Sequence, residues 1–221
     1  GGTLNGSADL TATSGFYWAT GTMSGTGKTI VGSAVTTGTI HTSDYGVAEP
    51  VLTRTLQNNG TIRHEGGYFN NSLTINTGGT LDNQGTYLFI ADTGINGSGG
   101  VVTNSGTFGK SGGAGASTIS AAFSNNSGLL NISSGQINGS GGFNLTGTGS
   151  ITGGIYQTGG SGNLSGALGG TGTVGLTGGT LTVDGTGFVP GYYQKGGTPN
   201  GHADLTATSD CYWGTGTTTG I

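Results

Sequence analysis

The sequence predicts an all-β protein that folds as a parallel β-helix (β-solenoid) with about 21–25 residues in each coil. Three observations lead to this fold class. The composition disfavours helices, a short phrase with asparagine and glycine recurs in the first half of the chain, and a longer phrase near the beginning returns near the end. Together they describe a chain that winds repeatedly through the same short strands and turns.

Small and polar residues dominate the chain, because 53 of its 221 residues are glycine, 39 threonine, 20 serine and 16 asparagine. All four are poor helix formers, since glycine loses the most backbone entropy and the others offer the backbone competing hydrogen bonds. Leucine, isoleucine, valine and phenylalanine total 43 residues, close to the level of about 20% that is typical of disordered chains. The net charge of −4 is low for a disordered chain and the apolar residues are regularly spaced, so ordered β structure is expected.

A short phrase recurs four times between residues 50 and 130, and each copy has an asparagine two or three residues before a glycine. The asparagines are Asn58, Asn83, Asn104 and Asn125, at successive offsets of 25, 21 and 21, and the glycines are Gly60, Gly85, Gly106 and Gly128. This spacing matches one coil of a parallel β-helix. We expect the asparagine side chains to form a hydrogen-bonded ladder from coil to coil, and the glycines to adopt left-handed φ at a sharp turn.

Apolar residues on both sides of each turn are expected to point inward and to stack along the axis of the solenoid. The predicted stacks are Leu56, Leu81, Val102 and Phe123 before the turn, and Ile62, Tyr87, Phe108 and Leu130 after it. Coordinates that placed members of one stack on opposite faces of the wall would contradict this register.

The chain contains a long duplication, because residues 8–18 read ADLTATSGFYW and residues 203–213 read ADLTATSDCYW. Over residues 5–26 and 200–221 there are 15 identities in 22 positions without a gap, at a constant offset of 195. The domain organisation predicted from this is one solenoid unit over residues 1–199, followed by the start of the next tandem repeat at 200–221. A unit of roughly nine coils would rise about 45 Å. The second copy is expected to continue the solenoid with surroundings equivalent to the first, and Trp213 is expected to be less well packed than Trp18.

Two segments depart from the regular pattern. Residues 42–54 combine a proline with several charged residues, and residues 187–199 contain two prolines, two tyrosines and a lysine. Both segments are expected to be loops or joints that leave the regular coils.

Three stretches carry a resemblance to a known class of proteins. They are Ala8-Asp-Leu-Thr-Ala-Thr with Trp18 and Gly21-Thr-Met-Ser-Gly-Thr-Gly27, then Arg54-Thr-Leu-Gln-Asn-Asn-Gly-Thr61, and Thr103-Asn-Ser-Gly-Thr-Phe-Gly-Lys-Ser-Gly-Gly113. They resemble the glycine-rich β-strand repeat proteins of bacterial surfaces, which are related in style to autotransporter passengers and filamentous haemagglutinin-like adhesins. The resemblance implies a right-handed parallel β-helix, secretion, and a role as a stalk, fibre or adhesive surface. It does not imply catalysis.

The chain offers little for catalysis or for metal binding. Its nine acidic residues are spread thinly, and Asp82 and Asp92 are expected on different sheets. His41, His64 and His202 have no metal-ligand spacing and are expected to be isolated surface imidazoles. The glycine-rich stretches lack the helix that would complete a phosphate-binding loop. We therefore expect no enzyme activity, no cofactor and no metal.

The charge and the hydropathy of the chain argue against nucleic acid and against a membrane span. Five lysines and arginines are too few for nucleic acid, and no run approaches the roughly 18 apolar residues of a membrane span. The single cysteine, Cys211, replaces Phe16 of the first copy and is expected to be a small buried residue. The expected partners are copies of the chain itself, joined end to end as a covalent array or as a polymer.

The predicted function is a structural, extracellular or cell-surface fibre or stalk built from tandem solenoid repeats. The alternative is an adhesin that binds a surface glycan or matrix, with Tyr192, Tyr193 and the segment 42–54 as candidate contacts. Two remote alternatives are a polysaccharide-cleaving β-helix and an ice-binding protein. The latter is suggested by Thr-Xaa-Thr phrases at residues 11–13, 20–22 and 206–208.

Overall fold

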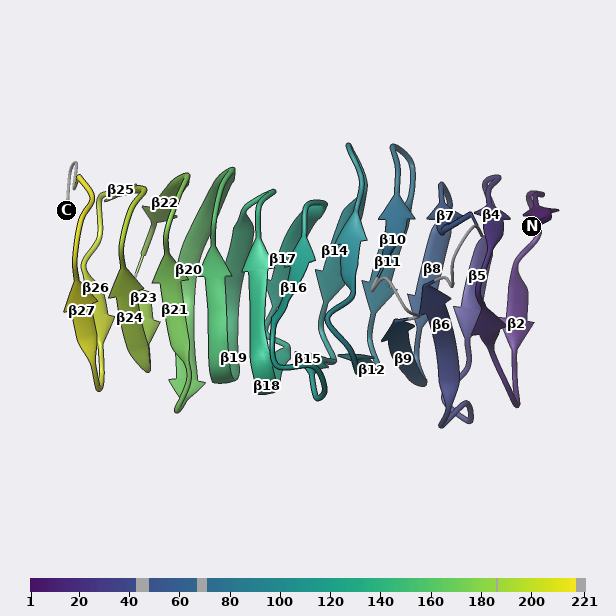
Figure 1. Cartoon of the computed structure of the whole chain (residues 1–221), viewed down its shortest axis with the longest axis horizontal. Helices are drawn as coiled ribbons and strands as arrows, with labels where there is room; N and C mark the ends of the chain where they lie inside the picture. The colour runs from purple at the N-terminus through teal and green to yellow at the C-terminus, as the bar shows by residue number, and fades with distance from the viewer. Residues whose placement is uncertain (43–47, 67–70, 186, 218–221) are drawn as a thin grey trace.

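The structure is a computed structural model that describes residues 1–42, 48–66, 71–185 and 187–217. Within these ranges the chain is all-β and has no helix. The strands stack as a β-solenoid of about 10 turns with about 21 residues per turn, which confirms the predicted fold class. Figure 1 shows the strands side by side along one axis, with the two ends of the chain at opposite ends of the solenoid.

Each turn contributes to three sheets that run along the axis, which we name sheets 1, 2 and 3. Sheet 1 contains β1 (Thr3–Leu4), β4 (Gly21–Met23), β7 (Pro50–Leu52), β10 (Ser72–Ile75), β13 (Gly94–Asn96), β16 (Ala116–Ile119), the end of β18 (Leu129–Gly139), the end of β19 (Phe143–Gln157), β21 (Thr173–Leu176), β24 (Gly191–Gln194) and β27 (Cys211–Trp213).

Sheet 2 contains β2 (Leu10–Ala12), β5 (Lys28–Val31), β8 (Thr55–Asn58), β11 (Thr80–Asn83), β14 (Val101–Asn104), β17 (Ala122–Asn126), the start of β19, the start of β20 (Ser161–Gly170), β22 (Thr180–Val183) and β25 (Thr198–Gly201). Sheet 3 contains β3 (Tyr17–Trp18), β6 (Gly38–Thr42), β9 (Thr61–Gly66), β12 (Thr86–Phe89), β15 (Thr107–Lys110), the start of β18, the middle of β19, the end of β20, β23 (Gly187–Val189) and β26 (Leu205–Ala207).

The strand pairs of the three sheets are parallel throughout the described ranges, so each coil hydrogen-bonds to the coils before and after it. The coils differ in length, because the offset between paired residues ranges from 29 for Gly21 and Pro50 to 18 for Val183 and Gly201. The strands β18, β19 and β20 are 11, 15 and 10 residues long and continue from one sheet into the next. These long strands join the three sheets into one continuous wall.

The core consists of ladders of inward side chains, as the apolar spacing predicts. Both predicted stacks are in register from coil to coil, and every member is at most 1% exposed. In the second stack the rings of Tyr87 and Phe108 lie parallel, with centroids 5.1 Å apart and an interplanar angle of 3°. The rings of Phe108, Phe123 and Phe143 continue edge to face, at 5.0 Å and 5.3 Å. Such contacts stabilise the core beyond the area that they bury.

The two copies of the duplicated phrase lie in the same solenoid but on different sheets. In the first copy β2 and β3 belong to sheets 2 and 3, whereas their counterparts β26 and β27 belong to sheets 3 and 1. In sheet 3, β26 is the ninth strand after β3, so the second copy lies nine coils and one sheet further on. The expectation of equivalent surroundings is therefore wrong, because the unequal coils between the two copies do not add up to a whole number of turns.

The inward and outward directions of the phrase are nevertheless preserved. Trp18 pairs with buried Ile40 and is 6% exposed. Trp213 pairs with buried Gln194 and is 49% exposed in the last described coil, so it is less well packed, as expected. Each tryptophan therefore faces inward, and burial of Trp213 requires another coil above it.

Neither irregular segment is a loop over its full length. Pro50–Leu52 forms β7 in sheet 1, and Arg54 is 2% exposed with its guanidinium donating to the carbonyl oxygens of Ala8 and Ser24. Residues 43–47 lie outside the described residues. The segment 187–199 is regular, because β23, β24 and the start of β25 fall within it. Its prolines fit because Pro190 lies between strands and Pro199 faces inward in register with Leu181.

Candidate functional site

The four predicted ladder asparagines form a hydrogen-bonded column inside the solenoid, and each is 0% exposed. The side-chain Nδ2 of Asn58 donates to Oδ1 of Asn83 at 2.7 Å, Asn83 donates to Asn104 at 2.7 Å, and Asn104 donates to Asn125 at 2.6 Å. The same amino groups also donate to backbone carbonyls one coil further on, such as that of Thr107 at 2.8 Å. The column satisfies buried polar groups and fixes the register of neighbouring coils, so its role is structural.

Each of the four predicted glycines lies two or three residues after an asparagine of the column. The expectation that these glycines adopt left-handed φ is wrong. None of them has positive φ. They are required for space, because a Cβ at Gly85 would overlap the carbonyl oxygen of Gly60 in the coil before it, and a Cβ at Gly106 would overlap that of Gly85. At Gly128 a Cβ would collide with the side chain of Asn104. The turn next to the asparagine column is therefore packed backbone against backbone.

His64 is fully buried, which corrects the expectation of a surface imidazole. It lies on β9 in register with Ile40 and Phe89, and it faces inward because it is two residues after Ile62. The Tyr87 hydroxyl lies 2.7 Å from Nδ1 of His64, and Oγ1 of Thr42 lies 3.2 Å from Nε2. Burial, with a smaller contribution from repulsion by His41, lowers the pKa of His64 from 6.5 to about 3. The imidazole is thus neutral, with Tyr87 as donor and Thr42 as acceptor.

This burial predicts that the protein loses stability as the pH falls from about 6.5 toward 3. In that window the unfolded chain binds a proton on His64 that the folded chain does not bind, so the free energy of unfolding falls by up to about 1.4 kcal/mol per pH unit. Urea unfolding at pH 7, 5 and 4 measures the slope. The variant His64→Gln should flatten the slope, whereas His202→Gln at an exposed position should not. An unchanged slope in His64→Gln would contradict the assignment.

Lys110 is a second titratable group that alternation places inside, two residues after Phe108. Its Nζ lies 2.7 Å from Oδ1 of Asp92 and donates to the carbonyl of Ala91 at 2.8 Å. The hydrogen bond from Lys110 lowers the pKa of Asp92, against partial desolvation, and the backbone N–H of Gly115 adds to the lowering. In the described part of the chain no three His, Cys, Asp or Glu side chains gather in a way that could hold a metal ion.

The two predicted tyrosine contacts point in opposite directions. Tyr192 is only 3% exposed, and its hydroxyl donates to Oε1 of Gln194 at 3.0 Å inside the solenoid, so the prediction that it is a surface contact is wrong. Tyr193 lies on the outer face of β24, since side chains alternate along a strand. There it is flanked by Tyr156 of β19 and Tyr212 of β27, and we name these three residues the tyrosine strip.

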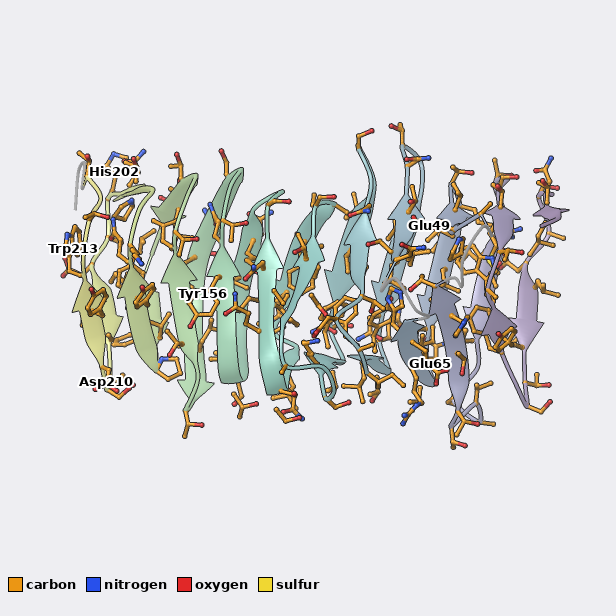
Figure 2. All side chains as sticks on the ribbon, viewed as in Figure 1. Glu49, Glu65, Tyr156, His202, Asp210 and Trp213 are labelled. Carbon is orange, nitrogen blue, oxygen red and sulfur yellow. The ribbon has the colours of Figure 1, made fainter. Side chains whose placement is uncertain are left out.

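The tyrosine strip runs along the outside of sheet 1, and Figure 2 labels Tyr156 in the C-terminal half of the solenoid and Trp213 at its C-terminal end. Register places Tyr156, Gly175, Tyr193 and Tyr212 in one row. The rings of Tyr193 and Tyr212 stack at 4.9 Å with an angle of 12°, and those of Tyr156 and Tyr193 meet edge to face at 6.0 Å. A Cβ at Gly175 would overlap the ring of Tyr156. The missing side chain therefore lets Tyr156 lean across the intervening coil toward Tyr193.

A shallow groove of about 470 Å³ lies beside the strip. It is lined by Gln136, Asn138, Tyr156, Thr158, Thr177 and Tyr193. Nε2 of Gln136 donates to Oδ1 of Asn138 at 2.8 Å, which orients both amides. Aromatic rings and neutral hydrogen-bonding groups thus occur together, without a charged group in the lining.

A larger hollow of about 620 Å³ is found at the C-terminal end, where inward residues of the last described coils are uncovered. Its lining includes Tyr192, Pro199, Leu205, Cys211 and Trp213. Cys211 is exposed, so the expectation of a buried residue is wrong for this chain. The lining also contains Asp204, Thr206 and Ala207, so the hollow combines uncovered core residues with a few polar groups.

Tyr156 and Tyr212 are not among the site residues predicted from sequence, although the sequence contains a signal. Ile155-Tyr156-Gln157 and Tyr192-Tyr193-Gln194 share the pattern of an apolar or aromatic residue, a tyrosine and a glutamine, at an offset of 37. In both triplets the outer residues are buried and the middle tyrosine faces outward.

Comparison with known proteins finds no matching family, no matching curated protein and no matching solved structure. The described residues include no helix that is long and apolar enough to cross a membrane.

Proposed function

We propose that this chain is a segment of an extracellular or cell-surface rod, built from tandem solenoid units that each run from one copy of the duplicated phrase to the next. The observation that carries the proposal is the position of that phrase. Its two copies lie nine coils apart on one continuous axis, with the same residues facing inward, and they do not pack against each other. In both copies the same residues of the phrase face inward, so further copies can continue the wall and extend it along the axis.

The interior supports the same function. Apolar ladders, the ring stack and the asparagine column all run parallel to the axis, so each coil is held by both of its neighbours. Parallel pairing of the coils adds backbone hydrogen bonds in the same direction. Such a wall resists bending and local opening, because opening a coil breaks contacts on two sides.

The described carboxylates and threonines favour the rod over the two remote alternatives. The carboxylate of Asp92 is occupied by Lys110 and by the backbone of Gly115, while Asp82 lies on sheet 2 and accepts from Thr103. An ice-binding face needs paired threonine rows on consecutive coils. The row Thr61, Thr86 and Thr107 is in register, but the partner positions carry Arg63, Leu88 and Gly109.

A chain with two units tests the proposal. Residues 1–195 placed directly before residues 1–221 should form one longer rod, and small-angle X-ray scattering should show a maximum dimension larger by about 45 Å with an unchanged cross-section. The single-unit chain at the same mass concentration is the control. A maximum dimension close to that of the single unit, or a doubled cross-section, would show that the units pack side by side and would refute the rod.

The two-unit chain also tests on which sheet each new copy of the phrase lies. Because each unit advances the phrase by one sheet, the second unit should present its outward tyrosines on the next face of the wall. Cryo-electron microscopy of longer arrays should therefore show equivalent faces returning every third unit.

A further inference from the structure

The outward tyrosine of the duplicated phrase is retained in both copies, although seven of the 22 aligned positions differ. Tyr17 is 70% exposed and Tyr212 is 53% exposed. Each lies next to a ring of the neighbouring coil, with centroid distances of 6.5 Å from Tyr17 to His41 and 4.9 Å from Tyr212 to Tyr193. A rod does not need these exposed rings, because the tryptophan that follows each tyrosine already faces the core.

Two glycines leave room for one ring of the tyrosine strip on the outer face of sheet 1. Gly175 is packed so closely that any side chain there would displace the ring of Tyr156. A Cβ at Gly154 would likewise lie 3.1 Å from the Tyr156 hydroxyl oxygen. Along the row Tyr156 lies between Asn138 and Gly175, and Tyr193 follows Gly175. The two glycines leave the space that the ring of Tyr156 occupies on the sheet surface. The result is an aromatic platform with a groove at its edge.

The groove beside the platform offers hydrogen bonds but no charge. The bond from Gln136 to Asn138 uses one hydrogen of the first amide and one lone pair of the second. The carbonyl oxygen of Gln136 and the amino group of Asn138 retain capacity for a ligand. The hydroxyls of Thr158 and Thr177 donate to the backbone carbonyls of Gly139 and Gln157, so they remain available as acceptors. This mixture of donors and acceptors suits a ligand with many hydroxyl groups.

The same features argue against other occupants. An acidic polysaccharide or a nucleic acid requires clustered cations, and none lines the groove. A stable protein partner buries about 1,600 Å² in total and usually meets an apolar centre, whereas this groove is narrow and its edge is formed by amides and hydroxyls. A pyranose ring matches the platform, because its axial C–H face packs on an aromatic ring while its hydroxyls reach the amides at the edge.

We propose that the tyrosine strip and its groove bind a neutral hexose-based glycan, with Tyr193 as the central stacking residue and with Gln136 and Asn138 bonding to sugar hydroxyls. This function is additional to that of a rod, and it would make sheet 1 an adhesive face.

The test is titration calorimetry and saturation-transfer NMR of the chain with four neutral hexasaccharides: maltohexaose, cellohexaose, laminarihexaose and mannohexaose. At least one should bind, and Tyr193→Ala should weaken that binding about tenfold. Tyr193→Phe should bind within about twofold of the parent, because it keeps the ring. Phe188→Ala is the matched control, an exposed aromatic residue on sheet 3, and should leave binding unchanged.

Several outcomes would overturn the proposal. They are no binding of any of the four sugars at millimolar concentration, or equal binding by Tyr193→Ala while its circular dichroism matches the parent chain. Equally tight binding of hexagalacturonate would refute the requirement for a neutral sugar. If the sugars fail to bind and Tyr193→Ala abolishes a concentration-dependent dimer, the strip binds a second copy of the chain. The dimensions of the two-unit rod are measured separately, so failure of sugar binding does not bear on the rod.

Discussion

Replacing Gly106 by alanine is expected to destabilise the solenoid by about 3 kcal/mol or more. The added methyl group would overlap the carbonyl oxygen of Gly85 and would lie 2.6 Å from the backbone carbon and oxygen of Gln84. All of these atoms belong to the backbone of the preceding coil, so no side chain can rotate away. The two coils would have to separate next to the hydrogen bond from Thr107 N to Gly85 O, which is 2.7 Å long.

Thermal unfolding followed by circular dichroism measures this effect, and the midpoint should fall by about 6–12 °C for a chain of this size. Gly15→Ala is the matched control, because a Cβ at Gly15 meets no atom within 4 Å and Gly15 does not have positive φ. The equivalent position of the second copy already carries Asp210. If Gly106→Ala unfolds at the temperature of Gly15→Ala, the close approach of the coils is not a constraint on this turn.

The inward ladders could be predicted from the sequence because they depend on two strong and local signals. Alternation assigns one face of each short strand to the core, and recurrence of the phrase at about 21–25 residues aligns the coils. Leu81 therefore lies in register with Leu56 and Val102, as expected. The same alternation, applied strictly from Ile62 and Phe108, also places His64 and Lys110 inside. Histidine and lysine are usually exposed, and this general preference led to the wrong expectation that His64 lies at the surface.

The sheet on which each phrase lies could not be predicted, because the coils differ in length. Paired residues are offset by 18 at Val183 and Gly201 but by 27 at Val31 and Asn58. Sequence spacing then counts coils only approximately, and an error of a few residues moves a strand to the next sheet. This is why sequence spacing places the second copy of the phrase on the wrong sheet. The steric reason for the four predicted glycines could not be predicted either, because the carbonyl that each glycine contacts belongs to another coil.

The candidate site could be predicted only in part. A pair such as Tyr192 and Tyr193 in a strand must place one ring inside and one outside, but which ring faces out depends on the register with Val174 and Gly175 below. Tyr156 is two coils away, so its contact with Tyr193 needs the coil between them to carry a glycine at this position. The groove is formed by four successive coils together and has no signature in any single strand.

Replacing Asn104 by alanine is expected to cost about 3–5 kcal/mol, the largest effect expected of a single polar side chain here. Asn104 is 0% exposed and both accepts from Asn83 at 2.7 Å and donates to Asn125 at 2.6 Å. Its removal leaves the Oδ1 atom of Asn125 without this donor and takes one acceptor from Asn83. It also opens a small cavity among backbone groups that cannot close, because the neighbouring coils are fixed by their own hydrogen bonds.

Urea unfolding at pH 7 measures the loss, and Asn96→Ala provides the control, since Asn96 is an exposed asparagine at the end of β13. Asn96→Ala should stay within about 0.5 kcal/mol of the parent chain. The asparagine column ends at Asn125, whose partner in the next coil is Leu145, so a solenoid coil can also be closed by an apolar residue. If apolar packing alone were sufficient at this position, Asn104→Leu would match the parent chain. We expect this variant to lose about 2 kcal/mol or more, because the amides of Asn83 and Asn125 on either side of it would still be buried and would lack their partner.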